Sequence, residues 1–173
     1  DVCSSDLEDL DMEVTTLGID LAKNVFQIHG IDRRGRLVMQ KRLTRAKFLP
    51  FLANLPPCLI GIEACGSSSY WARQLRSIGH QVRLISPQFV KPYVKTNKND
   101  YNDAEAICEA VTRPNTRFVP IKDIAQQDIQ ALHRVRARLV RDRTALVNQT
   151  RGMLREYGVF LPDGIRPFRN KIP

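Results

Sequence analysis

The sequence predicts an α/β domain followed by a long helix. Between residues 12 and 121, short apolar runs alternate with segments that repeat apolar residues every three or four positions. Between 124 and 157 there is no proline and no glycine until Gly152, and leucine or methionine recurs every seventh residue. The 173 residues are 43% hydrophobic, which is enough for one domain with a core and an appended segment.

Three β-type stretches open the domain, at residues 14–20, 24–31 and 36–43. The first two are separated only by Leu21-Ala-Lys23, and the next two by the polar turn Asp32-Arg-Arg-Gly35. Connections this short predict an antiparallel meander. Thr44 then provides an N-cap for a helix that ends before Pro56.

The domain continues with a strand, a helix, a strand and a helix, at residues 59–63, 67–79, 81–86 and 100–113. Ser67 to Ser69 supply capping hydroxyls for the first of these helices, and Gly79 can end it. Three strands, helix, strand, helix, strand, helix is the order of the ribonuclease H-like fold. We therefore predict this fold, a mixed sheet with flanking helices, followed by the long helix.

Four carboxylates fall at the ends of these elements. Asp20 closes the first strand, Glu63 closes the fourth, and Asp100 and Asp103 share one face of a first helical turn. Carboxylate oxygens suit Mg²⁺, with Mn²⁺ as a substitute, and two such ions about 4 Å apart can stabilise a phosphate displacement. We predict that all four acids are catalytic metal ligands and that Asp20 bridges the ions.

A glycine lies two residues before each strand-end acid, at Gly18 and Gly61. Residues two apart on a strand share a face, so our hypothesis is that these glycines leave room for a substrate backbone. The alternative is that each acid is an ordinary turn residue or helix cap. Asp100, at a helix start, fits that alternative best.

The chain is strongly basic, with a formal net charge of +9 and a pI near 9.8. Five of its 18 acidic residues lie within the first eleven positions, so the remainder is more basic still. This balance favours a polyanionic partner. The candidate nucleic-acid contacts are Lys23, Lys95, Lys98, Arg134, Arg136, Arg138 and Arg143. The alternative is a solvated basic surface.

Composition also limits the location and the boundaries. No apolar run approaches the roughly 18 to 20 residues of a bilayer span, and no secretory signal is visible, so we expect a cytoplasmic protein without a membrane partner. The four cysteines lack zinc-ligand spacing. We expect a non-native leader at 1–11, a catalytic domain at 12–121, a helical segment at 122–160 and a truncated tail at 161–173.

Three motifs surround the four acids: Leu17-Gly-Ile-Asp-Leu-Ala-Lys23, Gly61-Ile-Glu-Ala-Cys-Gly-Ser67 and Lys98-Asn-Asp-Tyr-Asn-Asp-Ala104. Together they resemble the DEDD transposases of bacterial insertion sequences, over about residues 12 to 161. The resemblance implies a RuvC-like domain whose acids match Asp20, Glu63, Asp100 and Asp103. In such a domain they coordinate Mg²⁺ to cut and rejoin DNA.

The resemblance also implies partners. These are DNA at the element ends and at the target, a structured guide RNA, and a second copy of the chain joined through the long helix. Complete family members carry a C-terminal domain with a nucleophilic serine, and nothing here matches that serine's motif. We therefore expect part of a transposase that does not recombine DNA by itself, and we do not assign Ser67 to Ser69 as nucleophiles.

Three other functions stay open at this point. A stand-alone nuclease or junction resolvase would use the same four acids, and a noncatalytic remnant would bind nucleic acid without them. An actin-like or sugar-kinase ATPase would share the superfold and could use Asp20 and Lys23. It would also need a second glycine-rich phosphate hairpin, and the nine glycines form no such cluster.

Overall fold

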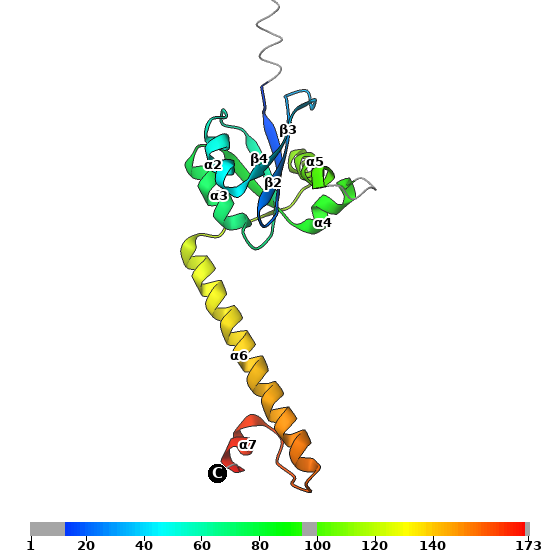
Figure 1. Cartoon of the computed structure of the whole chain (residues 1–173), viewed down its shortest axis with the longest axis vertical. Coiled ribbons are helices and arrows are strands. Elements are labelled where there is room, and N and C mark those ends of the chain that lie inside the picture. Colours follow the sequence, from blue (N-terminus) through cyan, green and yellow to red (C-terminus); the bar gives the residue numbers. More distant parts are fainter. Residues whose placement is uncertain (1–12, 95–99, 172–173) are drawn as a thin grey trace, which may run out of the picture. The chain divides into compact units, whose positions relative to one another are not determined.

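A computed structural model describes residues 13–94 and 100–171 of the chain (Figure 1). The chain divides into two compact units, Asp1–Asp123 and Ile124–Pro173. The first unit holds a sheet with helices on both faces, and the second holds two helices. Within the described residues, no helix is both long enough and apolar enough to cross a bilayer.

The sheet of the first unit has six strands in the order β3-β2-β1-β4-β5-β6. The strands are β1 (Thr16–Leu21), β2 (Val25–Ile31), β3 (Leu37–Thr44), β4 (Leu59–Glu63), β5 (Gln81–Ile85) and β6 (Phe118–Val119). β1 to β3 form an antiparallel meander, β4 and β5 run parallel to β1, and β6 is antiparallel to β5. The predicted ribonuclease H-like fold is confirmed.

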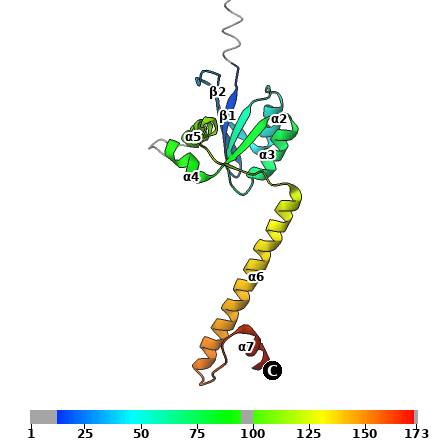
Figure 2. The same ribbon diagram turned by 180° about the vertical axis from the view of Figure 1, so that it is seen from behind.

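Helices cover both faces of the sheet (Figures 1 and 2). One face carries α2 (Arg45–Ala53) and α3 (Ser68–Ser77), and the other carries α4 (Pro87–Val90) and α5 (Asp100–Thr112). A short 3-10 helix, η1 (Lys91–Tyr93), follows α4. We did not predict α4, η1 or β6, because none exceeds four residues and such short segments show no hydrophobic period.

The capping of α2 and α3 differs from the prediction. Thr44 and Ser67 do occupy the N-cap positions, but neither side chain makes a capping hydrogen bond. Instead the Ser68 hydroxyl donates to the carbonyl oxygen of Cys65 at 3.0 Å and accepts from its amide at 3.2 Å. These bonds fix the turn that follows β4. Gly79, with a φ of +100°, ends α3 as predicted.

The larger core lies between the sheet and the α2–α3 layer. Its centre is an aromatic cluster of Phe26 from β2, Phe48 from α2 and Trp71 from α3. The ring centroids are 4.5 to 5.1 Å apart, and each pair meets edge to face. Such pairs add about 0.5 to 1.5 kcal/mol each beyond the burial of their area. The cluster therefore ties both helices to the sheet.

On the opposite face, α5 packs directly on two glycines. Gly18 of β1 and Gly61 of β4 are neighbours in the parallel ladder. A Cβ on Gly18 would collide with the carbonyl oxygen of Ala104, and one on Gly61 would lie 2.8 Å from Cβ of Val111. Our hypothesis that these glycines leave room for a substrate is therefore wrong. The helix fills that space, and only glycine permits so close an approach.

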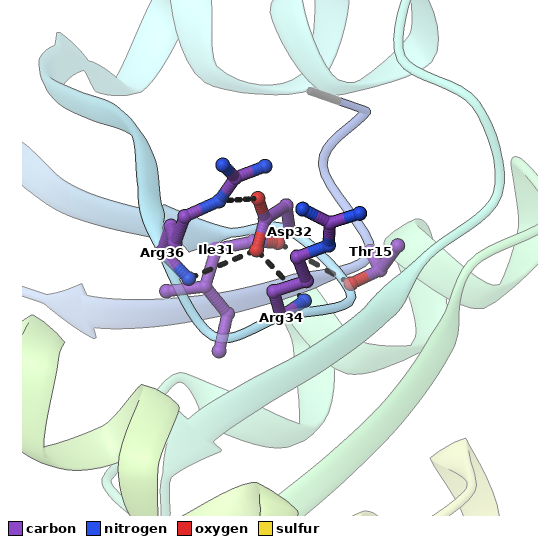
Figure 3. Close-up of polar contacts among 5 residues, drawn as sticks. All are labelled: Thr15, Ile31, Asp32, Arg34 and Arg36. Atoms are coloured by element: carbon purple, nitrogen blue, oxygen red, sulfur yellow. Dashed lines mark hydrogen bonds and ion pairs between the residues drawn. The ribbon is translucent and has the colours of Figure 1, made fainter. Parts of the chain in front are cut away.

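The β2–β3 turn is organised by one buried acid, as Figure 3 shows. The Asp32 carboxylate accepts hydrogen bonds from the amides of Arg34 and Arg36, at 2.8 and 2.9 Å, and from Nε of Arg36 at 2.8 Å. Burial alone would raise the pKa of Asp32, but these bonds and the Arg36 charge outweigh burial and lower the pKa below its ordinary 3.8. The turn therefore holds an ionised carboxylate.

The second unit consists of α6 (Ile124–Arg155) and α7 (Ile165–Lys171). At 32 residues, α6 is about 48 Å long, and it agrees closely with the helix we predicted at 124–157. We predicted no element after residue 161, so α7 is a correction. Its seven residues include Pro167 and are too few for a clear apolar period.

α7 is held against the end of α6 by a small cluster. Phe168 of α7 and Val147 of α6 are buried, and the guanidinium of Arg151 lies 5.8 Å from the Phe168 ring centroid. Arg151 also donates to the carbonyl oxygen of Gly164 at 3.0 Å and pairs with Asp163 at 3.5 Å. One arginine on α6 therefore fixes the loop that leads into α7.

The close packing of α5 gives a testable prediction. Gly18→Ala places a methyl group against helix backbone, which cannot rotate away as a side chain would. We expect it to lower the free energy of unfolding by about 1 to 3 kcal/mol or more, measured by urea denaturation. Gly66→Ala is the matched control, because nothing lies within 4 Å of its Cβ position, and it should change stability by less than about 0.5 kcal/mol. Equal effects of the two substitutions would contradict the packing argument.

Candidate active site

Asp20 and Glu63 are brought together by the parallel pairing of β1 and β4. The ladder pairs Gly18 with Gly61 and Ile19 with Ile62, so one further step sets Asp20 beside Glu63. Each acid lies two residues after a glycine that faces α5, and side chains two apart share a face. Both carboxylates therefore point to the α5 side of the sheet, where both are half-buried.

α5 contributes the third acid. Asp103, in the first turn of α5, is half-buried and immediately precedes Ala104, whose carbonyl oxygen lies over Gly18. The contact at Gly18 thus determines how near Asp103 comes to β1. Asp100 is the first residue of the same helix, but its side chain lies outside the described part of the structure. The positions of three of the four predicted ligands, Asp20, Glu63 and Asp103, can therefore be compared with one another.

The electrostatics of Glu63 show that these three acids influence one another. Burial raises the pKa of Glu63, and the negative charges of Asp20 and Asp103 raise it further. Like charges repel, so the ionised form of Glu63 is disfavoured here unless a cation is present. These acids come from three separate segments of the chain, and their role as metal ligands stays a prediction.

The donor chemistry of this cluster fits a divalent cation. All three side chains offer hard oxygen ligands, and the raised pKa of Glu63 reflects repulsion that such a cation would relieve. Among the described residues, however, no three His, Cys, Asp or Glu side chains are already placed to hold one ion. The repulsion acts over several ångströms, whereas ligation needs oxygens about 2.0 to 2.6 Å from one point. The acids are thus near neighbours whose oxygens have not converged on a single position.

Two polar residues on β2 beside this cluster were not among the predicted site residues. Gln27 and His29 are both buried, and in the antiparallel ladder they pair with Asp20 and Gly18. Their signal in the sequence was the pattern Phe26-Gln-Ile-His29, in which polar and apolar residues alternate within a strand. That alternation is usually read as a solvent-facing side, but here α5 covers it.

Of the three lysines predicted to contact nucleic acid, Lys23 lies in the described part of the structure. Lys23 is exposed in the β1–β2 turn, and its carbonyl oxygen accepts a hydrogen bond of 2.7 Å from Nη2 of Arg45. This bond fixes the turn near Asp20. Lys95 and Lys98 lie outside the described residues.

The four predicted arginine contacts all lie on α6 and are exposed. Arg138 donates from Nε to Asp142 at 2.8 Å, an exposed pair of the kind that adds at most about 1 kcal/mol. Arg143 lines a hollow of about 390 Å³ together with Ile165, Arg166 and Arg169. The last two arginines come from α7, which we had not predicted.

The fold and the acids define a ribonuclease H-like domain with an acidic cluster where β1, β4 and α5 meet. A family model described as a transposase, the IS110-type DEDD family, matches residues 17–159. The match covers both strands and the helix that carry the acids. The chain therefore belongs to this transposase family.

Curated relatives agree with this assignment. A "Probable family 20 transposase" of Pseudomonas aeruginosa is 58% identical over 148 residues, which are 86% of this chain and 44% of the relative. The transposase for insertion sequence element IS1328 of Yersinia enterocolitica is 49% identical over 152 residues, 88% of this chain and 46% of the relative. The transposase for IS1111A of Coxiella burnetii is 47% identical over 161 residues, 93% and 44% respectively. The chain spans less than half the length of these relatives.

Among solved structures, Thermus thermophilus RuvC in complex with a Holliday junction substrate is similar, with a TM-score of 0.46 and 13% sequence identity. The similarity covers 62% of this chain and all of the RuvC chain.

The raised pKa of Glu63 predicts a pH-dependent stability. The folded chain binds the Glu63 proton more tightly than the unfolded chain, whose carboxyl has its ordinary value of 4.5. This contribution to stability is fully present below pH 4.5 and is lost as the pH rises through the folded pKa. Without divalent cations, Glu63→Gln should therefore match the parent chain below pH 4.5 and become more stable than it towards neutral pH.

Urea unfolding at several pH values in EDTA measures this difference. Glu109→Gln is the control, since it removes a carboxylate from α5 that pairs with Arg113 and lies outside the cluster. It should bring no gain in stability at neutral pH. If Glu63→Gln also brought none, the acids would not be close enough to repel one another in solution.

Proposed function

We propose that this chain supplies the carboxylate part of the active centre of an insertion-sequence DNA transposase, acting with Mg²⁺ or, as a substitute, Mn²⁺. The observation that supports the proposal is that Asp20 and Asp103 lie close enough to Glu63 to raise its pKa, in a chain of this family. Because the chain spans less than half of its relatives, cleavage and rejoining of DNA are proposed for the complete protein. We also propose that the protein is located in the cytoplasm, because its proposed substrate is DNA.

In this proposal each acid has a defined task. Asp20, Glu63 and Asp103 hold the cation, and Asp100 completes the set from the start of α5. The bound cation would neutralise charge developing on a phosphate and lower the pKa of an attacking water. The chain's own contribution is positional, since β1 and β4 fix two acids side by side and α5 brings the others to them. Half-burial of the cluster strengthens every charge interaction within it.

The proposed partners are DNA at the element ends and target, a structured guide RNA and a second copy of the chain. α6 supports the nucleic-acid partners, since its predicted arginines are exposed and arginine pairs well with phosphate. It also supports self-association. Leu132, Leu139, Leu146 and Met153, at intervals of seven, are each 61 to 70% exposed. Such a row of apolar side chains is typical of a helix that pairs with another.

Two other functions are compatible with the same acids, and experiments can distinguish them from the transposase function. A nuclease or junction resolvase would use the same acids for metal-dependent nicking without rejoining. A noncatalytic remnant would bind nucleic acid whether or not the acids are present. The measured consequences of removing the acids distinguish all three.

The first experiment is a calorimetric titration of Mg²⁺ and Mn²⁺ into the chain with a branched DNA present. We expect binding that Asp20→Asn/Asp103→Asn weakens at least tenfold, because two of the oxygen donors lose their charge. Glu105→Gln/Glu109→Gln is the matched control, since it removes two carboxylates from α5 outside the cluster. It should leave the cation affinity unchanged.

The outcomes separate the candidate functions. Cation binding that ignores Asp20 and Asp103, with DNA binding intact, would contradict the proposal and favour the remnant. Binding that depends on them, with nicking of the branched DNA by the chain alone, would favour the nuclease. Binding that depends on them without nicking agrees with a transposase that needs its remaining part.

The arginines of α6 give a second test, because they lie on different sides of the helix. Arg134 and Arg138, four residues apart, share one face, whereas Arg136 and Arg143, seven apart, lie towards the apolar row. Arg134→Ser/Arg138→Ser should reduce the slope of log K against log salt for DNA binding by up to about 2, because up to two phosphate contacts are lost. Filter binding at several salt concentrations measures the slope.

Arg136→Ser/Arg143→Ser is the comparison. It removes the same charge beside the apolar row, so we expect it to strengthen self-association, which sedimentation equilibrium reports. If both double variants changed the salt slope equally and neither changed association, the division of α6 into a phosphate-binding side and a pairing side would be wrong.

A further inference from the structure

Gln27 is a buried polar side chain beside the acidic cluster. It lies on β2, is only 4% exposed, and pairs directly with Asp20 of β1 in the antiparallel ladder. Directly paired residues point to the same face, with Cβ atoms about 4.5 to 5.5 Å apart. Its strand neighbours Phe26 and Ile28 point the other way, into the core under α2 and α3. The Gln27 side chain therefore leaves the sheet beside that of Asp20, on the face that α5 covers.

The oxygen of this carboxamide is buried, yet it accepts no hydrogen bond from any residue that the structure describes. A buried acceptor without a donor is disfavoured, because it has lost its water and gained nothing in return. Met or Leu would fill the same space without that cost. A glutamine at this position is therefore best explained by a donor that binds beside Asp20.

The charge of the site narrows the choice of that donor. Position 27 pairs directly with Asp20, so another carboxylate there would set two negative charges side by side. A neutral amide oxygen offers an acceptor without adding charge. Water molecules held by a divalent cation are strong donors, and Mg²⁺ usually keeps several of them.

We propose that Gln27 is a positioning residue for a hydrated divalent cation, with Oε1 accepting a hydrogen bond from a water molecule on the ion that Asp20 holds. The inference rests on the proposed function, because it needs a cation at the carboxylates. It adds a fifth residue to the four acids, from a strand that carries none of them. Residues that orient a metal shell in this way typically contribute tenfold or more to metal affinity.

The test uses the whole chain and two substitutions at this position. Gln27→Met keeps the size of the side chain and removes the unpartnered oxygen. We expect the Tm in EDTA to stay the same or rise, whereas the calorimetric Kd for Mn²⁺ should weaken about tenfold. A purely structural glutamine would behave in the opposite way, with a lower Tm in EDTA and an unchanged Kd, and that result would overturn the inference.

Gln27→Glu tests the location independently. A new carboxylate beside Asp20 should lower the Tm in EDTA, and saturating Mg²⁺ should recover the loss. Gln40→Glu is the matched control, on exposed β3 opposite His29, and Mg²⁺ should not change its Tm more than that of the parent chain. A loss in Gln27→Glu that Mg²⁺ does not recover would contradict the placement of Gln27 at the cation.

Asp20→Asn, titrated in parallel, separates this inference from the proposed function. If Asp20→Asn weakens Mn²⁺ binding and Gln27→Met does not, the inference fails while the proposed function stands. If neither substitution changes Mn²⁺ binding, or the parent chain binds none, the proposed function fails and the inference fails with it.

Discussion

The contact between α5 and the two glycines of β1 and β4 is the constraint on which the site depends. Gly18 and Gly61 are paired across the sheet, and the backbone of α5 lies where their side chains would be. A larger residue at either position would lift the helix from the sheet. Since α5 carries Asp103, the same movement would take this acid away from Asp20 and Glu63. The packing of α5 on the sheet and the charge interactions among the acids therefore both depend on this one contact.

The two faces of the sheet therefore carry different kinds of side chain. The face under α2 and α3 is closed by aromatic and aliphatic side chains, and it contributes most of the core. The face under α5 combines a smaller apolar cluster with acids and buried polar groups. Alternation along each strand separates the two sets, so that Ile19 lies in the core while Asp20 lies in the acidic cluster. The apolar core and the acidic cluster thus occupy alternate positions of the same strands.

Much of this could be predicted from the sequence, because β1, β4 and α5 have clear patterns and their acids lie at ends that the fold brings together. The role of Gly18 and Gly61 could not, since a glycine in a strand leaves room equally for a substrate or a helix, and only the packing decides. Gln27 resembled a surface residue because alternation does not show which face is covered. α7 was missed since its stability comes from contacts of Phe168 and Arg151 with distant residues.

The acids that repel one another come from three segments that are far apart in the sequence. In an unfolded chain they are separated and do not interact, so the repulsion at Glu63 arises only when the sheet and α5 have assembled. The native state therefore carries a charge repulsion that the unfolded chain does not. The stability of the folded domain should therefore depend on the ions in solution, because cations that screen or bind these acids relieve a repulsion that the unfolded chain lacks.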